Sequence, residues 1–336
     1  MAARRRSRQV ETLLEPTLKT ESEHLTPLMQ FFALHRMATP YNVLDAFPQF
    51  FKQHKYVMLH LNWLANQGWL RRHGDKRSGY TYNITNTGYE RCRDTDIGVE
   101  LNRIPYKYQE PTGKQVQHEL LITKTAVSLY QCVREQPEIR ILAEGRFALG
   151  NIVVIDQDTG EDLRPFEHLV PDYFYLSRDR NGLMFRLVEV VRGVESVTDI
   201  RGMIAQYEQW EQTRVARQFL TGLYRQWGAK QPQPEYQLHC ILESSSWKHT
   251  DAWKERVTMM QTFHVHPVTQ GRVWTTTKEA LETALAEGVT INHAIWRRGK
   301  DLLGERRRRF AQAPDGTRTR LVDQFIRNLP MHPLFA

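Results

Sequence analysis

Two apolar segments joined by a short turn constrain the fold of this chain more than any other feature. Residues 169–177 and 184–191 read as strands, and the Asn181-Gly182 pair between them is typical of tight hairpin turns. Neighbouring strands lie about 5 Å apart, so Asp172 at the start of the first strand would meet Glu189 near the end of the second. The pattern therefore predicts a hairpin that carries two carboxylates at one end.

The two acids of this hairpin admit two interpretations. An Asp after proline, as in Pro171-Asp172, is common turn chemistry, and a Glu among valines can point to solvent. However, residues 185–191 read as a mostly buried strand, where an unpaired carboxylate is energetically costly. Hard divalent cations prefer carboxylate oxygens. We therefore expect Asp172 and Glu189 to hold Mg²⁺ or Mn²⁺, with turn chemistry and solvent exposure as the alternative.

The length and the charge distribution set the domain organisation. A chain of 336 residues with 40% hydrophobic content predicts two globular domains, or one domain with a large appendage. Residues 1–95 carry 14 Lys and Arg against 8 Asp and Glu, and residues 290–336 carry 10 against 4, although the whole chain is only +8. An acidic middle between basic ends suits a carboxylate metal site whose flanks bind a polyanion. The alternative is that the basic ends, including the tail at residues 1–24, are only solvated.

Several classes of protein do not fit the sequence. The cysteines Cys92, Cys132 and Cys240 lie far apart without CxxC spacing, which argues against a disulfide framework or a structural zinc site. No apolar region follows the basic N-terminus, and no run reaches the roughly 20 apolar residues of a membrane span. The glycines do not form a phosphate-binding or dinucleotide-binding loop. We expect a soluble protein of the bacterial cytoplasm with no membrane partner.

Residues 25–92 combine three helical segments with a hairpin. Thr26 is expected to cap the first helix, and Thr39-Pro40 opens the second. The third runs roughly from residue 51 to residue 66 and ends before Gly68, which can adopt the left-handed cap conformation. Strands at residues 69–73 and 80–85 then enclose a basic turn. This order predicts a winged helix-turn-helix domain at residues 25–95.

The phrase Leu-Ala-Asn-Gln-Gly-Trp-Leu-Arg-Arg, followed by Tyr-Thr-Tyr-Asn-Ile-Thr-Asn-Thr-Gly, resembles winged-helix DNA-binding domains. The resemblance implies that the third helix enters the major groove of double-stranded DNA and that the hairpin approaches the backbone. The alternative is a winged helix that contacts only protein, against which the basic hairpin argues. The DNA-binding residues that we expect are Lys52, Gln53, His54 and Lys55 on the helix, and Arg71, Arg72, Lys76 and Arg77 on the hairpin.

A second domain follows a polar connector at residues 96–113. Apolar residues at helical spacing predict a helix at residues 116–130, with His118 and Glu119 in its first turn. Strands are expected at residues 139–144 and 151–155, before the acidic hairpin. One long amphipathic helix at residues 196–227, a strand at 236–243 and a helix at 250–262 complete the order. This predicts an α+β or α/β domain at residues 114–290, with a mixed sheet flanked by helices.

This order of elements, with Pro171-Asp172 and the downstream Glu189, resembles the restriction-endonuclease-like PD-(D/E)XK nuclease fold. Together with the winged helix, it resembles the replication-relaxation family of plasmid and mobile-element proteins, whose relatives include a class of conjugative relaxases. The resemblance covers roughly residues 25–245. The residues that carry it are His118, Glu144, Pro171-Asp172, Glu189, Arg192-Gly193, Glu195 and Tyr207.

The resemblance implies metal-dependent cleavage of a phosphodiester bond. Asp172 and Glu189 would be the metal ligands, and the metal would activate a water and stabilise charge on the scissile phosphate. His118, or Glu119 beside it, would supply a further ligand or a proton-transfer group, and Glu144 would be a further acid at the site. The alternative for His118 is a capping or packing role, which is more common for a helical histidine.

One position departs from the pattern of the nuclease fold. Its members carry a Lys two residues after the Glu, and replication-relaxation relatives often carry an Asp there, whereas this chain has Val191. The missing group would orient water or offset phosphate charge. Arg186 and Arg192 share a strand parity that places them on the other face from Glu189. Arg201, in the long helix, is therefore our candidate for a relocated catalytic cation.

The C-terminal part of the chain contains weaker signals. His264-Val-His266 has the spacing of two ligands on one face of a strand, but no third zinc ligand lies nearby, so an exposed polar strand is the preferred interpretation. A strand at residues 273–278 and a helix at 279–286 follow. Residues 291–336 form a basic extension expected to bind nucleic acid or a partner. Its expected DNA-binding residues are Arg306, Arg307, Arg308 and Arg309.

The sequence thus predicts a DNA-binding protein of a mobile genetic element that nicks its site during transfer or replication. A catalytically inactive DNA-binding accessory or regulator is the first alternative, which Val191 favours and the two acids oppose. A protein-interaction module within a transfer, transposition or replication complex is the second. The expected partners are double-stranded DNA, other proteins of such complexes, and a second copy of the chain, because winged helices often pair on palindromic sites.

Overall fold

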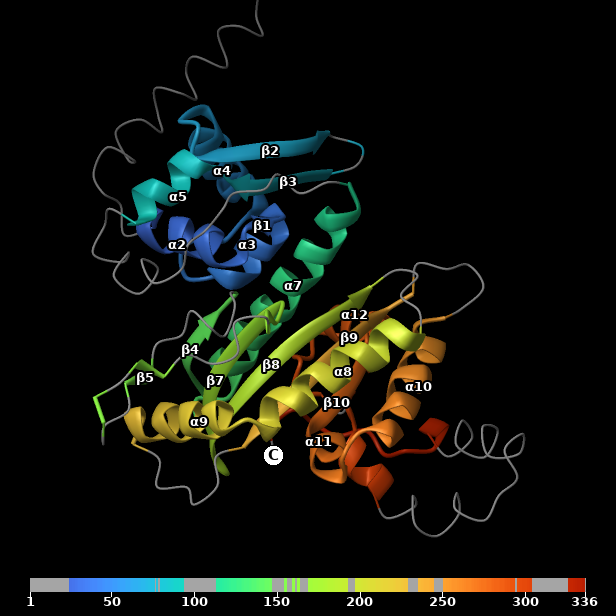
Figure 1. The fold of residues 1–336 in the computed structure, drawn as a ribbon. Coiled ribbons are helices and arrows are strands. Elements are labelled where there is room, and N and C mark those ends of the chain that lie inside the picture. The colour runs from blue at the N-terminus through green and yellow to red at the C-terminus, as the bar shows by residue number, and fades with distance from the viewer. Residues whose placement is uncertain are drawn as a thin grey trace, which may run out of the picture. The chain divides into compact units, whose positions relative to one another are not determined.

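The computed structural model describes residues 24–75, 77, 79–93, 113–146, 154–155, 159–160, 162–163, 169–192, 197–228, 235–244, 250–293, 295–303 and 326–335. The chain forms two compact units, Met1–Val127 and Ser128–Ala336, here called the N-terminal and C-terminal units (Figure 1). The division falls within helix α7 (Gly113–Glu135), after the 96–113 connector that the sequence predicts.

The N-terminal unit contains a three-stranded antiparallel sheet, of order β1-β3-β2, and a group of short helices. Phe32, Val57, Leu61 and Ile84 are fully buried and form part of its core. The order of three helices and a hairpin agrees with the sequence-based expectation. The elements are α2 (Leu25–His35), β1 (Met37–Ala38), α3 (Pro40–Ala46), α4 (His54–Asn66), β2 (Leu70–Asp75), β3 (Gly79–Ile84) and α5 (Asn86–Arg93).

Local capping explains where these helices begin and end. Thr39 and Asn42 form a reciprocal capping box at the start of α3, as the Thr39-Pro40 pair predicts. Gly68 has φ +74° and ends α4. The expected cap at Thr26 is wrong, because α2 begins one residue earlier and its N-cap position is His24. Helix α4 also begins at His54 rather than near residue 51, since Gln53 has extended backbone angles.

The C-terminal unit is built on a six-stranded sheet of order β11-β10-β9-β8-β7-β4. Strands β8, β9 and β10 are parallel, whereas the other neighbours are antiparallel. This mixed sheet, with helices against it, confirms the predicted α+β class. The strands are β4 (Arg140–Gly145), β7 (Tyr173–Asp179), β8 (Gly182–Arg192), β9 (Tyr236–Glu243), β10 (Val273–Thr277) and β11 (Arg297–Arg298), and a separate pair joins β5 (Val154–Ile155) to β6 (Asp162–Leu163).

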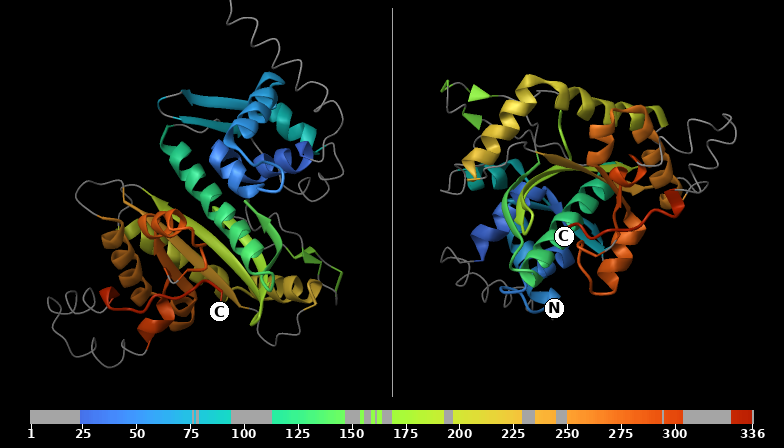
Figure 2. Two further views of the ribbon diagram at one scale, coloured as in Figure 1. Left: turned by 180° about the vertical axis from the view of Figure 1, so that it is seen from behind. Right: turned by 90° about the horizontal axis from the view of Figure 1, so that it is seen from below.

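Helices cover one face of the sheet and bury its apolar residues. Phe174, Leu187 and Val191 of the sheet pack with Ile204 and Phe219 of the helices in one core cluster. Figure 2 shows these helices along one side of the curved sheet. The helices that follow α7 are α8 (Val197–Gln212), α9 (Arg214–Gln226), α10 (Asp251–Gln261), α11 (Pro267–Arg272) and α12 (Lys278–Ala286), with short 3₁₀ turns η2 (Thr262–His264) and η3 (Gly299–Leu302).

Two expectations about this unit are wrong. The single long helix predicted at residues 196–227 is divided at Thr213, whose Oγ1 accepts a hydrogen bond from Ala216 N at 3.0 Å and caps α9. The expected strand through His264 and His266 is absent from this described segment. His264 ends η2, and His266 caps α11 by accepting the Val268 N–H at 3.3 Å.

The acidic hairpin forms as predicted, except that the two turn residues are Arg180 and Asn181 and Gly182 is already the first residue of β8. Strands β7 and β8 pair in register from Tyr173 opposite Val188 to Asp179 opposite Gly182. The turn is closed by Asp179, whose Oδ1 accepts the Asn181 N–H at 2.8 Å, and Gly182 has φ +111°. None of the helices in the described part of the chain has the length and apolarity that a membrane crossing requires.

Candidate functional site

The hairpin brings Asp172 and Glu189 together, and we call them the acid pair. Tyr173 pairs with Val188, so the next residues outward, Asp172 and Glu189, lie opposite each other across the two strands. Side chains alternate along a strand, which places both acids on the face that carries Phe174 and Leu187. That is the face covered by α8 and α9. The acid pair therefore lies at the edge of a helix-covered, largely apolar layer.

Each acid is held by a hydrogen bond from the chain itself. Asp172 Oδ2 accepts the backbone N–H of Val190 at 2.8 Å, and the Tyr207 hydroxyl of α8 donates to Glu189 Oε1. Tyr207 is only 1% exposed. Burial, followed by the negative charges of Glu189 and Asp172, raises the pKa of Tyr207 well above its ordinary value. The Tyr207 hydroxyl is thus a hydrogen-bond donor that orients a carboxylate, and not an ionised nucleophile.

The donor set of the acid pair fits a hard divalent cation. Mg²⁺ is commonly bound by one or two protein carboxylates and keeps several water ligands. Within the described residues, no group of three or more His, Cys, Asp and Glu side chains is arranged to hold a metal. Two carboxylates completed by water are a ligand set that suits Mg²⁺ or Mn²⁺ better than zinc.

Glu144 lies apart from the acid pair. It pairs with Tyr175 in the β4–β7 ladder, which places it on the opposite face of the sheet from Asp172 and Glu189. There it accepts hydrogen bonds from the hydroxyls of Tyr130, at 2.8 Å, and Tyr173. Burial raises the pKa of Glu144, although these two hydrogen bonds act in the other direction. The structure thus does not bring Glu144 to the site where the sequence analysis expects it.

The cations considered from sequence also lie away from the acid pair or at the surface. Arg186 lies on the same face of the sheet as Glu144, because both residues pair with Tyr175 in β7. Arg192, six residues further along β8 and paired with Glu243 in β9, lies on that face too, since side chains alternate along a strand. Arg201 is exposed on α8. His118 and Glu119 are half-buried on α7, in the N-terminal unit, whereas the acid pair belongs to the C-terminal unit.

Two buried cations that no sequence pattern singles out as site residues lie at strand ends near the acid pair. Arg146, immediately after β4, donates its Nε–H to the backbone carbonyl of Asp172 at 2.9 Å. Lys254, in the first turns of α10, donates from Nζ to the backbone carbonyl of Glu243 at 3.2 Å. A signal for Lys254 exists in the sequence, since it shares a helical stripe with the buried Val257 and Thr258.

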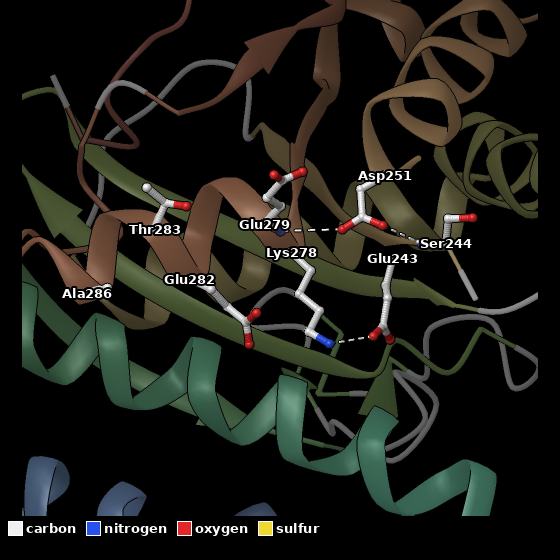
Figure 3. Close-up of a pocket in the computed structure, with 8 residues that line it drawn as sticks. All are labelled: Glu243, Ser244, Asp251, Lys278, Glu279, Glu282, Thr283 and Ala286. Carbon is white, nitrogen blue, oxygen red and sulfur yellow. Dashed lines mark hydrogen bonds and ion pairs between the residues drawn. The ribbon is translucent and has the colours of Figure 1, made fainter. Parts of the chain in front are cut away.

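A pocket of about 420 Å³ lies where β9 and β10 end (Figure 3). Asp251, the first residue of α10, connects this helix to the segment after β9 and to α12. Its carboxylate accepts the backbone N–H of Ser244 at 2.7 Å and that of Glu279 at 3.4 Å. Glu243 accepts from Lys278 Nζ at 2.5 Å and from Arg192 Nε. Burial alone would raise the pKa of Glu243, but the hydrogen bonds from Lys278 and Arg192 outweigh it and lower that pKa. These contacts join the ends of β8 and β9 to α12.

The four DNA-binding candidates of the third helix are grouped at the start of α4. Lys52, Gln53 and Lys55 are exposed, and Lys52 Nζ donates to the backbone carbonyl of Pro48 at 2.8 Å. The His54 ring lies 4.5 Å from the Tyr41 ring, whose residue is 64% exposed. The start of α4 therefore presents basic and aromatic side chains together, a composition typical of nucleic-acid interfaces.

Asn62 is one of the side chains that tie the basic hairpin to this helix. Asn62 of α4 accepts hydrogen bonds at Oδ1 from Tyr82 in β3, at 2.8 Å, and from Arg72 in β2, at 3.2 Å. Arg71, Arg72 and Arg77 are exposed. Lys76 and the run Arg306, Arg307, Arg308 and Arg309 lie outside the described residues.

Comparison with protein families gives an independent assignment. A sequence model of the family described as replication-relaxation matches residues 29–223, which is more than half of the chain. The matched range contains the helices and hairpin of the N-terminal unit, the acid pair and Tyr207. Neither the curated proteins nor the solved structures gave a match. The family connects the chain with replication and mobile-element processes. The chain belongs to the replication-relaxation family.

Proposed function

We propose that this protein binds DNA of a mobile genetic element and nicks it with a divalent metal ion held by Asp172 and Glu189. The observation that carries the proposal is the register of β7 and β8, which puts two acidic residues opposite each other on one face of the sheet. A bound Mg²⁺ or Mn²⁺ would lower the pKa of a water ligand and offset charge on the scissile phosphate. The family of the chain supports this use of the site.

The chain's own groups would keep the two carboxylates oriented for that role. The Val190 N–H holds Asp172 through Oδ2, and the Tyr207 hydroxyl holds Glu189 through Oε1. Such supporting hydrogen bonds limit how far a ligand can turn and so fix the direction in which its remaining lone pairs point. In this proposal Val190 and Tyr207 are positioning groups, whereas Asp172 and Glu189 are the ligands.

The proposal assigns a restriction-endonuclease-like fold to the C-terminal unit. Its mixed sheet has helices packed against it, and its acids lie at the ends of two neighbouring inner strands. Both features are expected of a nuclease of the PD-(D/E)XK type. The DNA backbone would then approach the acid pair from these strand ends.

The N-terminal unit would supply DNA recognition as a winged helix-turn-helix. Helices α2, α3 and α4 would form the helical part, α4 would enter the major groove, and the β2–β3 hairpin would be the wing. The exposed cations at the start of α4 and on β2 support this assignment. The link from Asn62 to Arg72 and Tyr82 would keep helix and wing in a fixed relation on the duplex.

A second function, DNA binding without cleavage, has one specific observation in its favour. Val191 is 3% exposed, pairs with Leu242 and belongs to the apolar core cluster, so β8 offers no cation beside Glu189 on that face. In this reading the protein is an accessory or regulator that keeps the nuclease fold as a scaffold. Double-stranded DNA would be the partner in both cases.

Plasmid nicking separates the two functions. Supercoiled plasmid carrying the cognate element would be incubated with Mn²⁺ and the wild-type protein, the conservative variants Asp172→Asn and Glu189→Gln, and the control Glu138→Gln. Glu138 is a surface acid that pairs with Arg180. The nicking proposal requires relaxed product with the wild type and the control but not with the two site variants. Tight DNA binding by a wild type that never nicks would establish the regulator.

A further inference from the structure

Helix α9 carries a stripe of arginines on its outer face. Arg214, Arg217 and Arg225 are exposed, whereas Phe219 and Leu223 of the same helix are buried in the apolar core cluster. An α-helix turns about 100° per residue, so the three arginines lie within about 80° of one another around its axis. The helix contains no Asp or Glu. Its outer face therefore carries positive charge without a compensating acid of its own.

The stability of α9 does not explain the first two of these arginines. Arg214 is the first residue of the helix, at the positive end of the helix dipole, where a cation is unfavourable. Arg217 is its neighbour on the helix surface, so the two guanidinium groups repel each other. Arg217 donates to the backbone carbonyl of Gln212 at 3.3 Å, but this neutral acceptor leaves the positive charge in place. A bound anion would remove the cost of both positions.

Two further arginines oppose each other where β4 begins and β7 ends. Arg140 pairs with Arg178 in the β4–β7 ladder, and both residues are exposed. Side chains directly opposite each other in an antiparallel pair lie on one face about 5 Å apart, where like charges are unfavourable. Arg178 has the parity of Phe174, which places the pair on the face covered by α8 and α9. The Arg178 guanidinium donates to the carbonyl of Trp227, the C-cap of α9, at 2.6 Å, so the pair adjoins the end of this helix (Figure 1).

Together these residues form what we call the arginine face. Its members are Arg140, Arg178, Arg214, Arg217 and Arg225. The guanidinium group is planar and donates two parallel hydrogen bonds, so it suits phosphate oxygens better than a lysine ammonium does. Arg178 and Arg225 also lie at the negative end of the α9 dipole, where a cation stabilises the helix. This benefit does not extend to the other three.

The composition of the arginine face favours a phosphate polymer over a protein or a lipid surface. Protein interfaces are centred on buried aromatic or apolar anchors. All of α9 is described, and Val215, at 39% exposure, is its one exposed large apolar side chain. The other large apolar residues of α9 are buried in the core cluster, so they are not available to enter a membrane. Repeated arginines without apolar anchors match a backbone with regularly spaced negative charges.

We propose that the arginine face binds the phosphate backbone of duplex DNA and gives the C-terminal unit a DNA contact separate from the acid pair. The inference rests on the proposed function only in that the partner is DNA. Asp172 precedes β7 and Arg178 is next to its last residue, so the length of the strand separates them by about 20 Å. Arg214 and Arg225 lie about 16 Å apart along the helix, the length of several phosphates spaced at about 3.4 Å. Phosphate contacts carry no base information, so the face adds affinity for every duplex.

The salt dependence of DNA binding tests the arginine face in the full-length protein. For duplex DNA, each phosphate contact contributes about 0.9 to the slope of log K against log salt concentration. The triple variant Arg214→Gln, Arg217→Gln and Arg225→Gln is expected to reduce the slope by about 2.7 on duplexes of random sequence. Glutamine is a good helix former and the three side chains are exposed, so the melting temperature is expected to stay close to that of the wild type. A folded triple variant with the wild-type slope would overturn the inference.

Further variants separate a local contact from an effect of net charge. Arg217→Gln alone is expected to reduce the slope by about 0.9, whereas Arg134→Gln, at an exposed arginine of α7 in the same unit, is expected to keep the wild-type slope. Replacement of the three α9 arginines by lysine keeps the charge, so the slope is expected to remain while the affinity falls. An equal fall in slope in Arg217→Gln and Arg134→Gln would show a general charge effect and contradict the proposed surface.

Nicking separates this inference from the proposed function. Because the arginine face is remote from the acid pair, the triple glutamine variant is expected to nick at the wild-type rate once DNA is saturating. A wild type that binds duplex DNA without nicking it would count against the proposed cleavage alone, and the salt slopes would still decide the inference. A wild type with no affinity for duplex DNA would overturn both.

Discussion

The Tyr207 hydroxyl donates a hydrogen bond to Glu189 Oε1 from a helix whose neighbouring contacts with the sheet are apolar. Ile204 and Trp210, one turn away on either side, are fully buried in the same cluster. An unsatisfied buried donor or acceptor is energetically costly, so the hydrogen bond to Glu189 stabilises the Tyr207 hydroxyl in this layer. The hydrogen bond between Tyr207 and Glu189 therefore contributes to the stability of the core and also orients the Glu189 carboxylate.

Tyr207→Phe is expected to destabilise the protein while leaving the ring packing intact. Loss of a hydrogen bond to a charged group costs about 2 kcal/mol. The variant is expected to show this cost because the Glu189 carboxylate remains in place while the hydroxyl that donated to it is lost. Urea unfolding would measure the change, with Tyr41→Phe at the exposed Tyr41 as the control. The double variant with Glu189→Gln is expected to lose less than the sum of the two single variants. Additive losses would show that the two side chains do not interact.

The ion pairs of Glu243 with Lys278 and Arg192 are expected to make the free energy of unfolding depend on pH in the acid range. Burial opposes ionisation of Glu243, but Lys278 and Arg192 outweigh it, so its pKa in the folded protein lies below the ordinary value of 4.5. When the pKa of an acid is lower in the folded protein, its ionised form stabilises the fold. This stabilisation is complete at pH values above the pKa in the unfolded chain, and it is lost as the pH falls through the pKa in the folded protein.

Lys278→Met tests this dependence, because it removes one of the two cations. Unfolding free energies measured between pH 7 and pH 3 are expected to fall less steeply below about pH 4.5 in this variant than in the wild type. Lys300→Met, at an exposed lysine of the same unit, is the matched control. Parallel curves for Lys278→Met and the wild type would refute the assignment.

Thr213→Ala is expected to loosen the start of α9. The Thr213 hydroxyl satisfies the Ala216 N–H, and loss of such an N-cap costs about 1 kcal/mol. Thr198→Ala, at an exposed threonine in the first turn of α8, is expected to be nearly neutral. Thermal unfolding of the two variants would compare them directly. Equal melting temperatures would mean that the cap contributes nothing to the break between α8 and α9.

The proposed DNA contacts of the wing lead to a further expectation. Arg71 is exposed on β2, so Arg71→Gln is expected to weaken binding to all duplexes by a similar factor and to reduce the salt slope by about 0.9. Arg91→Gln is the control, because Arg91 is exposed on α5 and lies over the Trp69 ring at 4.1 Å. Fluorescence anisotropy at several salt concentrations would give both slopes. A wild-type slope in Arg71→Gln would remove Arg71 from the interface.

Local patterns predict the hairpin and its acids well. The sequence predicts a tight turn between the strands, but its two central residues are Arg180 and Asn181, because Gly182 already pairs with Asp179, and this register brings Asp172 opposite Glu189. The same alternation correctly separates Arg186 from Glu189. Thr39 is also identified from sequence, because its capping box involves only residues three positions apart. In each case the information lies within a few residues or within one strand pair.

The features that the sequence does not predict depend on distant parts of the chain. The face on which Glu144 lies follows from its pairing with Tyr175 and from an irregularity between Ile141 and Ala143. The apolar spacing continues through α8 and α9, so periodicity does not show the break at Thr213. The contacts of Arg146 and Lys254 with the carbonyls of Asp172 and Glu243 also depend on the order of strands in the sheet, which no local pattern specifies.

Asp172 stands one residue before β7 begins and uses its side chain to bond the Val190 N–H. A carboxylate thus continues the hydrogen-bond ladder at the point where the backbone of β7 no longer does so. The Val190 amide is for this reason a built-in reporter of the acid pair. Its hydrogen exchange at fixed pH is expected to slow when Mg²⁺ is added, which allows occupancy of the site to be followed without DNA and without turnover.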